Sequence, residues 1–246
     1  MSSFEGKVIV VTGGGGSIGS AIARAFAQAG GQVAVLDIDL ASAERTCTAL
    51  SELGAEARAW SCDITDPDSV ARTIADVCDW GGAIDVLVNN AGGIADALFH
   101  KMTLTDWDRI IDLCLKGTFL MTHTALDALK ATRGRIVTIG SMSYRGNVGQ
   151  TNYATAKAGL VGFTMSLGLE LARFGITVNL VAPGLVEGPS LDALGDDVKA
   201  RLNKMIPIGR PVTGAEIAHA VMFFAAPEAA AVTRQVLHVS GGNEGF

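Results

Sequence analysis

A tyrosine and a lysine four residues apart are the first candidates for chemistry in this chain. Tyr153 and Lys157 lie in the stretch Asn-Tyr-Ala-Thr-Ala-Lys, and Tyr153 is one of only two tyrosines. Positions i and i+4 share one face of an α-helix, so the phenol and the ammonium can point into one site. A free phenol has a pKa of about 10, and a neighbouring cation favours the ionised form. The pair therefore indicates a tyrosine acid or base, although two unrelated helix residues would give the same spacing.

A glycine-rich turn near the N-terminus predicts a nucleotide site. The apolar run at 7–11 leads into Thr-Gly-Gly-Gly-Gly-Ser-Ile-Gly at 12–19, and an apolar helical pattern follows. A strand, a glycine turn and a helix in this order can bind a pyrophosphate, because the backbone approaches the phosphates and the helix N-terminus favours their charge. A merely flexible loop is the alternative. The candidate cofactor-binding residues in this turn are Gly13, Gly16, Ser17, Ile18 and Gly19.

An acidic residue at the end of the next strand pattern indicates which dinucleotide binds. Asp37 closes the run 32–37, in the window after the glycine turn where a carboxylate can accept hydrogen bonds from the adenosine ribose. The same carboxylate repels a 2′-phosphate, and residues 37–42 contain no Arg or Lys to bind one. We therefore expect NAD rather than NADP. An ordinary turn aspartate is the alternative.

Together with later motifs, these residues resemble the classical short-chain dehydrogenase/reductase family over nearly the whole chain. The matching motifs are Thr12-Gly13 with the following glycines, Asp63 in Cys-Asp-Ile-Thr, Asn89-Asn90-Ala91-Gly92, Ser141, Tyr153 with Lys157, Pro183-Gly184, and Ser240-Gly241-Gly242. Each motif alone is weak, but their number and order make the resemblance specific.

The resemblance implies a role for each matching residue. Ser141 would hydrogen-bond the substrate oxygen, Tyr153 would exchange the proton, and Lys157 would also bind the nicotinamide ribose. Ser143 is the alternative for the serine. The further cofactor contacts implied by the family are Asp63, Ile64, Asn90, Ala91, Gly92, Pro183, Gly184 and Val186.

Three positions depart from the family pattern. Ser17 stands at a glycine position, and the segment 185–189 lacks the threonine expected near the nicotinamide. Cys114 stands where the family has a catalytic asparagine, whose main-chain carbonyl holds a water of a proton relay. We expect Cys114 to keep this role through its own carbonyl, whereas a small apolar helix residue is the alternative.

Alternating strand and helix patterns must position these residues. Strand patterns lie near 7–12, 32–37, 56–61, 84–89, 134–140, 176–181 and 235–239. Helical patterns lie near 18–30, 41–53, 67–79, 104–131, 150–174 and 214–226. The alternation predicts an α/β fold, a doubly wound seven-stranded parallel sheet of the Rossmann type, as a single domain over 1–246. Residues 185–213 interrupt the rhythm beyond a strand end and predict a substrate lid, with a surface excursion as the alternative.

Composition limits the partners and the compartment. The net charge is −6 and basic runs are absent from the sequence, which argues against nucleic acid or an anionic membrane as a partner. The scattered cysteines Cys47, Cys62, Cys78 and Cys114 indicate neither a metal site nor a disulfide framework. The sequence shows no signal-peptide pattern and no apolar run near the ~18 residues of a membrane span, so we expect a cytoplasmic protein.

The expected activity is NAD-dependent hydride transfer between a secondary alcohol and a ketone. The candidate residues of a mainly apolar pocket are Ile94, Leu98, Met142, Tyr144, Arg145, Val148, Leu185, Val186 and Met205. One alternative is a 3-oxoacyl-thioester reductase acting on acyl-carrier-protein or CoA substrates, which would be expected to prefer the NADPH that Asp37 disfavours. The other is an NAD-binding regulatory protein with impaired catalysis, which only Cys114 supports.

An apolar series in the helical pattern at 150–174 bears on assembly. Its members are Leu160, Phe163, Leu167 and Leu171. Because the family commonly associates through such helices, the resemblance implies a homo-oligomer, and a tetramer in particular. The alternative is that the series faces the sheet of its own subunit.

Overall fold

Parallel strands form the centre of the molecule. The computed structural model describes residues 3–244, so the outermost residues of the predicted domain lie outside it. Within this range the strands are β1 (Val8–Thr12), β2 (Gln32–Asp37), β3 (Ala57–Ser61), β4 (Val86–Asn89), β5 (Arg135–Ile139), β6 (Thr177–Pro183) and β7 (Val236–Val239). They pair in parallel in the order β3-β2-β1-β4-β5-β6-β7. This order confirms the predicted doubly wound α/β sheet.

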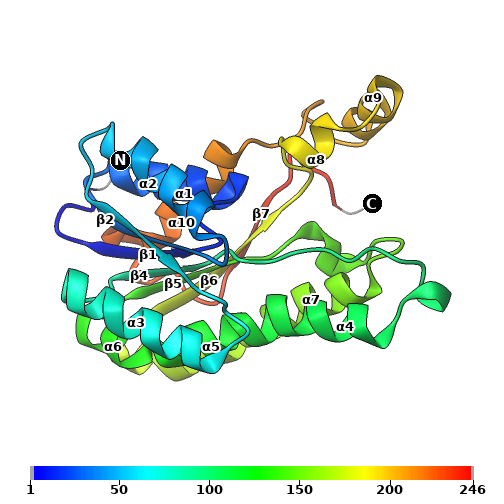
Figure 1. The fold of residues 1–246 in the computed structure, drawn as a ribbon. Helices are drawn as coiled ribbons and strands as arrows, with labels where there is room; N and C mark the ends of the chain where they lie inside the picture. Colours follow the sequence, from blue (N-terminus) through cyan, green and yellow to red (C-terminus); the bar gives the residue numbers. More distant parts are fainter. Residues whose placement is uncertain (1–2, 245–246) are drawn as a thin grey trace.

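Helices cover both faces of the sheet, as Figure 1 shows. One face carries α1 (Ser17–Gln28), α2 (Leu40–Ser51) and α10 (Gly214–Ala225). The other face carries α3 (Pro67–Gly81), α4 (Leu104–Ile111), α5 (Gly117–Thr124), α6 (Leu126–Thr132) and α7 (Thr151–Leu171). Each of these layers packs its apolar side chains against the strands, so the sheet separates two cores.

Strand β1 shows why both layers are needed. All of its residues are buried, and successive side chains point into opposite cores. Ile9 packs with Phe26 of α1 on one face. Val10 packs with Ile74 of α3 on the other. Burial of each such side chain contributes about 1.5–3 kcal/mol, which favours an uninterrupted apolar strand over an alternating one.

The direction of winding reverses between β1 and β4. The chain passes from β1 to β2 on one side, whereas β4 pairs with β1 on the other. In open α/β sheets, ligands bind in the crevice beyond the carboxyl ends of the strands at such a point. The glycine turn after β1 and the Asn-Asn-Ala-Gly segment after β4 both begin at this edge.

The helical stretch predicted at 104–131 is not one helix. A π-helical turn, η2 (Asp112–Lys116), separates α4 from α5, and α6 begins after Ala125. Thr118 Oγ1 donates to the carbonyl oxygen of Cys114 at 2.9 Å. A threonine that bonds back to the preceding turn bends a helix, and the apolar periodicity of the sequence does not reveal such a bend.

The segment predicted as a lid contains two short helices. These are α8 (Pro189–Asp192) and α9 (Asp196–Lys204), which extend beyond the sheet in Figure 1. The ends of the segment are joined, because Glu187 N donates to Val212 O and Val212 N donates to Leu185 O, each at 2.9 Å. The excursion is therefore fastened at its base, and Ile208 N also joins it to the C-terminal loop by donating to Gly241 O at 3.1 Å.

Residues 3–244 contain neither a membrane-spanning helix nor a metal-binding cluster. None of the helices there is both long enough and apolar enough to cross a membrane. In the same range, no group of three or more His, Cys, Asp or Glu side chains could hold a metal ion.

Candidate active site

The turn between β1 and α1 is built so that only glycine fits at its closest points. Gly13 has a φ of 60°, in the left-handed region that glycine adopts without strain. A Cβ at Gly19 would lie 2.1 Å from the carbonyl oxygen of Gly13. The backbone of the turn can therefore pack tightly under the N-terminus of α1, where an anion is stabilised.

A cleft of about 350 Å³ lies along this turn. It brings together the predicted cofactor-binding residues Gly13, Gly16, Ser17, Ile18, Gly19, Asp37, Asp63, Ile64, Asn90, Ala91 and Gly92. Its lining also includes Ile38, Cys62 and Leu113, which the sequence analysis missed. Ile38 and Cys62 each adjoin a predicted residue, so a wider window around Asp37 and Asp63 could have found them.

The two sides of the crevice are joined by hydrogen bonds. Thr12 Oγ1 accepts from the backbone N–H groups of Asn90 and Ala91, both at 3.0 Å. Asn90 Nδ2 donates to the carbonyl oxygens of Thr12 and Gly13, at 2.9 and 3.0 Å. These bonds hold the loop after β4 against the glycine turn, so the cleft has fixed walls.

Two carboxylates are held in place on the cleft wall. Asp37 Oδ2 accepts from Gly15 N at 3.0 Å, and Asp37 Oδ1 accepts from Asp39 N at 3.1 Å. Asp63 Oδ1 accepts from the backbone N–H and the hydroxyl of Thr65, at 2.8 and 2.7 Å. The glycine cradle and the two carboxylates fit a dinucleotide with an adenosine ribose beside Asp37.

Lys157 is almost completely buried beside the carboxyl end of β5. Its exposed fraction is 3%. The ammonium donates to the carbonyl oxygen of Ile139 at 2.8 Å and lies 5.5 Å from the centre of the Tyr153 ring. The two side chains project from successive turns of α7, as the sequence spacing predicts. Burying an ammonium is costly, and the Ile139 carbonyl offsets only part of that cost.

A buried asparagine next to Tyr153 anchors the start of α7. Asn152 is fully buried, and its Nδ2 donates to Ala95 O and Asp106 O at 3.1 and 3.2 Å. Its Oδ1 accepts from the backbone N–H of Tyr153 at 2.8 Å. Asn152 thus ties Tyr153 to the loop after β4 and to α4. The sequence analysis missed this residue, although a polar side chain adjoining the tyrosine was the available signal.

Ser141 begins the turn that follows β5. Its Oγ accepts from Ser143 N at 3.1 Å and caps the 3₁₀ helix η3 (Met142–Arg145). Ser141 is half-buried, whereas Ser143 is 5% exposed. Of the two serines, Ser141 therefore has the more accessible side chain.

Cys114 lies close to Lys157 but bonds elsewhere. Its thiol donates to Gly93 O at 3.6 Å, and a Cβ at Gly92 would lie 3.5 Å from Sγ and 3.7 Å from Lys157 Nζ. The Cys114 carbonyl already accepts from Thr118. A carbonyl oxygen has two lone pairs, and the Thr118 hydroxyl occupies one of them.

Three residues predicted for the substrate pocket have other roles. Met142 is 1% exposed and packs with Leu180 in a core cluster, so its assignment to the pocket was wrong. Tyr144 Oη lies 3.1 Å from His238 Nε2 on β7. Arg145 donates to Tyr144 Oη and to the carbonyl oxygen of Glu244, at 3.2 and 3.0 Å. The turn η3 directs these side chains toward the C-terminal strand.

The remaining pocket candidates divide by exposure. Ile94, Leu98, Val148 and Met205 are exposed apolar residues. Leu185 and Val186 are half-buried, and Val186 also packs against the core under α1 and α10. Pro183 ends β6, and the backbone N–H of Gly184 donates to Val239 O at 2.9 Å.

Comparison with known proteins places this fold and site in a family. Residues 13–244 match a family model described as enoyl-(acyl carrier protein) reductase. The chain is 43% identical over 243 residues to the 3-oxoacyl-[acyl-carrier-protein] reductase FabG of Escherichia coli strain K12, with 98% of each chain covered. It is 38% identical over 241 residues to the FabG reductase of Thermotoga maritima, with 97% of this chain and 98% of that one covered.

The fold and the cleft define an oxidoreductase that uses a nicotinamide dinucleotide. The chain belongs to the short-chain dehydrogenase/reductase family, as its motifs indicated.

Proposed function

We propose that this protein is an NAD(H)-dependent oxidoreductase that interconverts 3-oxoacyl and 3-hydroxyacyl thioesters. The observation that carries the proposal is the 38–43% identity, over nearly the full length, to reductases whose name specifies a 3-oxoacyl substrate. The sequence analysis expected a simple secondary alcohol as the substrate. The identity to these reductases favours its alternative, a 3-oxoacyl thioester. The chemistry is shared, because carbon 3 of a 3-hydroxyacyl thioester is itself a secondary alcohol.

Asp37 supports NAD rather than NADP as the dinucleotide. Its carboxylate lines the cleft and is fixed by Gly15 N and Asp39 N. In this position it can accept from ribose hydroxyls and repel a 2′-phosphate. The cleft is also lined by Asp63, Ile64, Asn90, Ala91 and Gly92. The residues that we assign to the nicotinamide end are Pro183, Gly184 and Val186.

The bound nicotinamide supplies the hydride for reduction and accepts it in oxidation. Ser141 donates a hydrogen bond to the substrate oxygen and holds it beside Tyr153. The Tyr153 hydroxyl gives its proton to this oxygen as the carbonyl becomes an alcohol, and takes it back in the reverse direction. Lys157 stabilises the phenolate left on Tyr153 and binds the nicotinamide ribose hydroxyls. The Cys114 carbonyl holds a water that returns the proton through Lys157.

The substrate enters under the segment 185–213, which we assign as a lid. Its joined base lies directly after Pro183-Gly184, and this position supports a lid over the proposed nicotinamide end of the cleft. The exposed apolar residues Ile94, Leu98, Val148 and Met205 supply a surface for an acyl chain. The cytoplasm, with its acyl thioesters, remains the predicted compartment.

A substrate panel tests the proposed function. A 3-oxoacyl-CoA, the same acyl group on acyl carrier protein, and a plain 2-alkanone of equal length would be reduced with NADH or NADPH and followed at the nicotinamide absorbance. We expect kcat/KM to be highest for a thioester with NADH. A higher kcat/KM with the alkanone would favour a simple alcohol dehydrogenase instead. NADH binding without turnover of any of them would support the regulatory alternative instead.

A further inference from the structure

Tyr153 lies in the first turn of α7, which begins at Thr151. The backbone N–H groups in the first turn of a helix have no acceptor within the helix, so side chains or water must satisfy them. For Tyr153 this acceptor is the side chain of the preceding residue, because Asn152 Oδ1 accepts from Tyr153 N at 2.8 Å. The backbone of the candidate acid or base is therefore held by its neighbour in the sequence.

The amide nitrogen of Asn152 extends this hold to two other elements. It donates to Ala95 O in the loop after β4 and to Asp106 O in α4, and the side chain is fully buried. Ala95 and Tyr153 also pack against one apolar cluster, which contains Ile110 of α4. The elements that hold the backbone of Tyr153 through Asn152 are thus the same elements that surround its side chain.

Further hydrogen bonds join the loop after β4 to the chain just before α7. Ala97 N donates to Gly149 O at 2.9 Å. Gln150 Nε2 donates to both carboxylate oxygens of Asp96, at 3.2 and 3.1 Å. The approach to α7 is therefore attached to this loop at successive residues, and Asn152 is the buried end of the attachment.

We propose that Asn152 is a positioning residue that sets where the Tyr153 hydroxyl lies relative to the substrate oxygen and to Lys157. Lys157 is held separately, by Ile139 O at 2.8 Å, so loss of the Asn152 amide should displace the phenol while the ammonium stays in place. A displacement of about 1 Å can slow a reaction by ~10²-fold. The inference rests on the proposed function, in which Tyr153 exchanges the proton.

The small number of tyrosines allows a test without any substrate. The chain has only Tyr144 and Tyr153, so labelling tyrosine with ¹³C at Cζ should give two NMR signals, which Tyr153→Phe assigns. We expect Asn152→Ala to shift or broaden the signal of Tyr153. The signal of Tyr144 should stay unchanged, because its hydroxyl pairs with His238 on β7. An unchanged Tyr153 signal in the folded variant would overturn the proposal.

Kinetics show whether the displacement affects the chemistry. The single-turnover oxidation of bound NADH by a 3-oxoacyl-CoA should slow by roughly 10- to 100-fold in Asn152→Ala. The NADH affinity should stay near that of the wild type, because Asn152 does not line the cleft. Asn152→Ser keeps a short polar side chain at the start of the helix, and it carries the same test if Asn152→Ala does not fold. A wild-type rate in the folded variant would also overturn the proposal.

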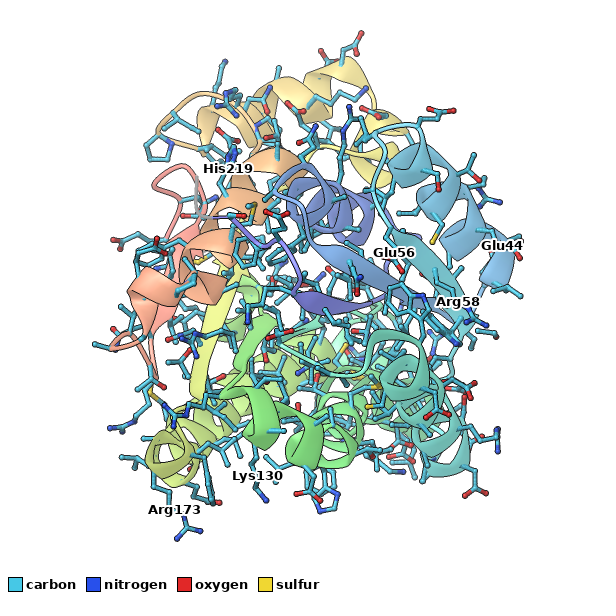
Figure 2. The ribbon with its side chains drawn as sticks, turned by 90° about the vertical axis from the view of Figure 1, so that its left-hand side faces the viewer. Glu44, Glu56, Arg58, Lys130, Arg173 and His219 are labelled. Carbon is cyan, nitrogen blue, oxygen red and sulfur yellow. The ribbon has the colours of Figure 1, made fainter. Side chains whose placement is uncertain are left out.

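Thr132→Val is the control for the loss of a side-chain hydrogen bond away from the site. Thr132 Oγ1 donates to Ile84 O at 2.7 Å, at the amino ends of the strands. Lys130 marks its helix, α6, at the lower end of the molecule in Figure 2. We expect Thr132→Val to lower Tm and to leave the Tyr153 signal and the rate unchanged.

The outcomes separate this inference from the proposed function. If Thr132→Val slowed the reaction as much as Asn152→Ala, the effect would be a general loss of stability, and the positioning role would be overturned. A wild type that binds no NADH and reduces no 3-oxoacyl thioester would overturn the proposed function, and the catalytic role of Asn152 with it. A Tyr153 signal that ignores Asn152 in an active enzyme would overturn this inference alone.

Discussion

At the scale of single residues, the site depends on a buried cation. Lys157 is 3% exposed, and its ammonium has one carbonyl acceptor, Ile139 O. An ammonium has three donors, so two remain for the proposed bonds to the nicotinamide ribose. Burying an incompletely paired ammonium lowers the stability of the fold, so its presence here indicates a functional role. Its position on α7, one turn after Tyr153, is what the four-residue spacing predicts.

Replacement of Cys114 tests the residue that departs most from the family pattern. Cys114→Asn should leave NADH affinity within about twofold and keep or raise turnover, if the main-chain carbonyl carries the relay. The thiol donates to Gly93 O at 3.6 Å, and a thiol is a weak donor, so the loss of this bond should cost little. Steady-state kinetics and NADH fluorescence titration measure the two effects. Abolished turnover in a folded variant would show that the thiol has a role of its own.

The residues that could be predicted are those with a local signature. The glycine turn, Asp37, Tyr153 and Lys157 follow from spacing and from the strand or helix that precedes them. Met142 and Tyr144 could not be placed, because the turn η3 redirects their side chains toward β6 and β7.

At the scale of elements, a polar cluster fastens the segment 185–213 to α10. Arg210 donates to both carboxylate oxygens of Glu216, at 3.0 and 2.6 Å. Glu216 also accepts from Thr213 N at 2.8 Å and completes a capping box at the start of α10. The base of the segment 185–213 is therefore tied to a helix that packs in the core.

The stability contributed by this cluster should depend on pH. Hydrogen bonding by Arg210, followed by that of Thr213, lowers the pKa of Glu216 to about 2 from a usual value of 4.5. A carboxylate with a lowered pKa stabilises the fold above its unfolded pKa, and this contribution is lost as the pH falls through the folded value. Glu216→Gln should lower Tm at pH 7 by on the order of 1–4 °C.

Thermal unfolding of the wild type and Glu216→Gln across pH measures this effect. The Tm difference should be constant above about pH 5 and should shrink between pH 4.5 and about 2. Glu170→Gln changes an exposed carboxylate on α7, outside the capping box, and serves as the control. A difference that stayed the same down to pH 2 would contradict the assignment to ionised Glu216.

The sequence patterns predicted which segments form strands and which form helices, but they did not predict the breaks within a helical stretch. Each predicted strand is present within two residues at each end, because buried apolar runs between turns leave little choice. The stretch 104–131 reads as one helix, yet Thr118 and the π-helical turn η2 divide it. A side chain that bonds its own backbone is a local choice that apolar periodicity does not encode.

At the scale of the whole molecule, the apolar series on α7 divides between core and surface. Leu160 and Leu171 are 1% and 4% exposed and belong to the cores of this chain. These two leucines therefore pack within their own subunit, which was the alternative to an interface role. Phe163 and Leu167 are half-buried, and Leu169 is 62% exposed. Leu167 also packs against the core of this chain, so Phe163 and Leu169 are the members of this group that an interface on α7 could use.

Light scattering during gel filtration tests assembly at micromolar concentration. We expect a homo-oligomer, with a tetramer as the specific prediction, because an exposed leucine beside half-buried apolar residues gains by burial. Leu169→Lys should shift the population to smaller species, whereas Leu53→Lys, an exposed leucine outside α7, should not. A monomeric wild type would contradict the prediction.

The central claim is that Tyr153 transfers the proton in a cleft that binds a nicotinamide dinucleotide. Tyr153→Phe keeps the ring and removes only the hydroxyl, so the fold and NADH binding should survive. The most direct measurement is the single-turnover oxidation of bound NADH by a 3-oxoacyl thioester, with the wild type and the variant compared at equal NADH occupancy. The rate should fall by ~10²–10⁴-fold, as for a lost general acid. A variant that binds NADH and oxidises it at a near-wild-type rate would contradict the account.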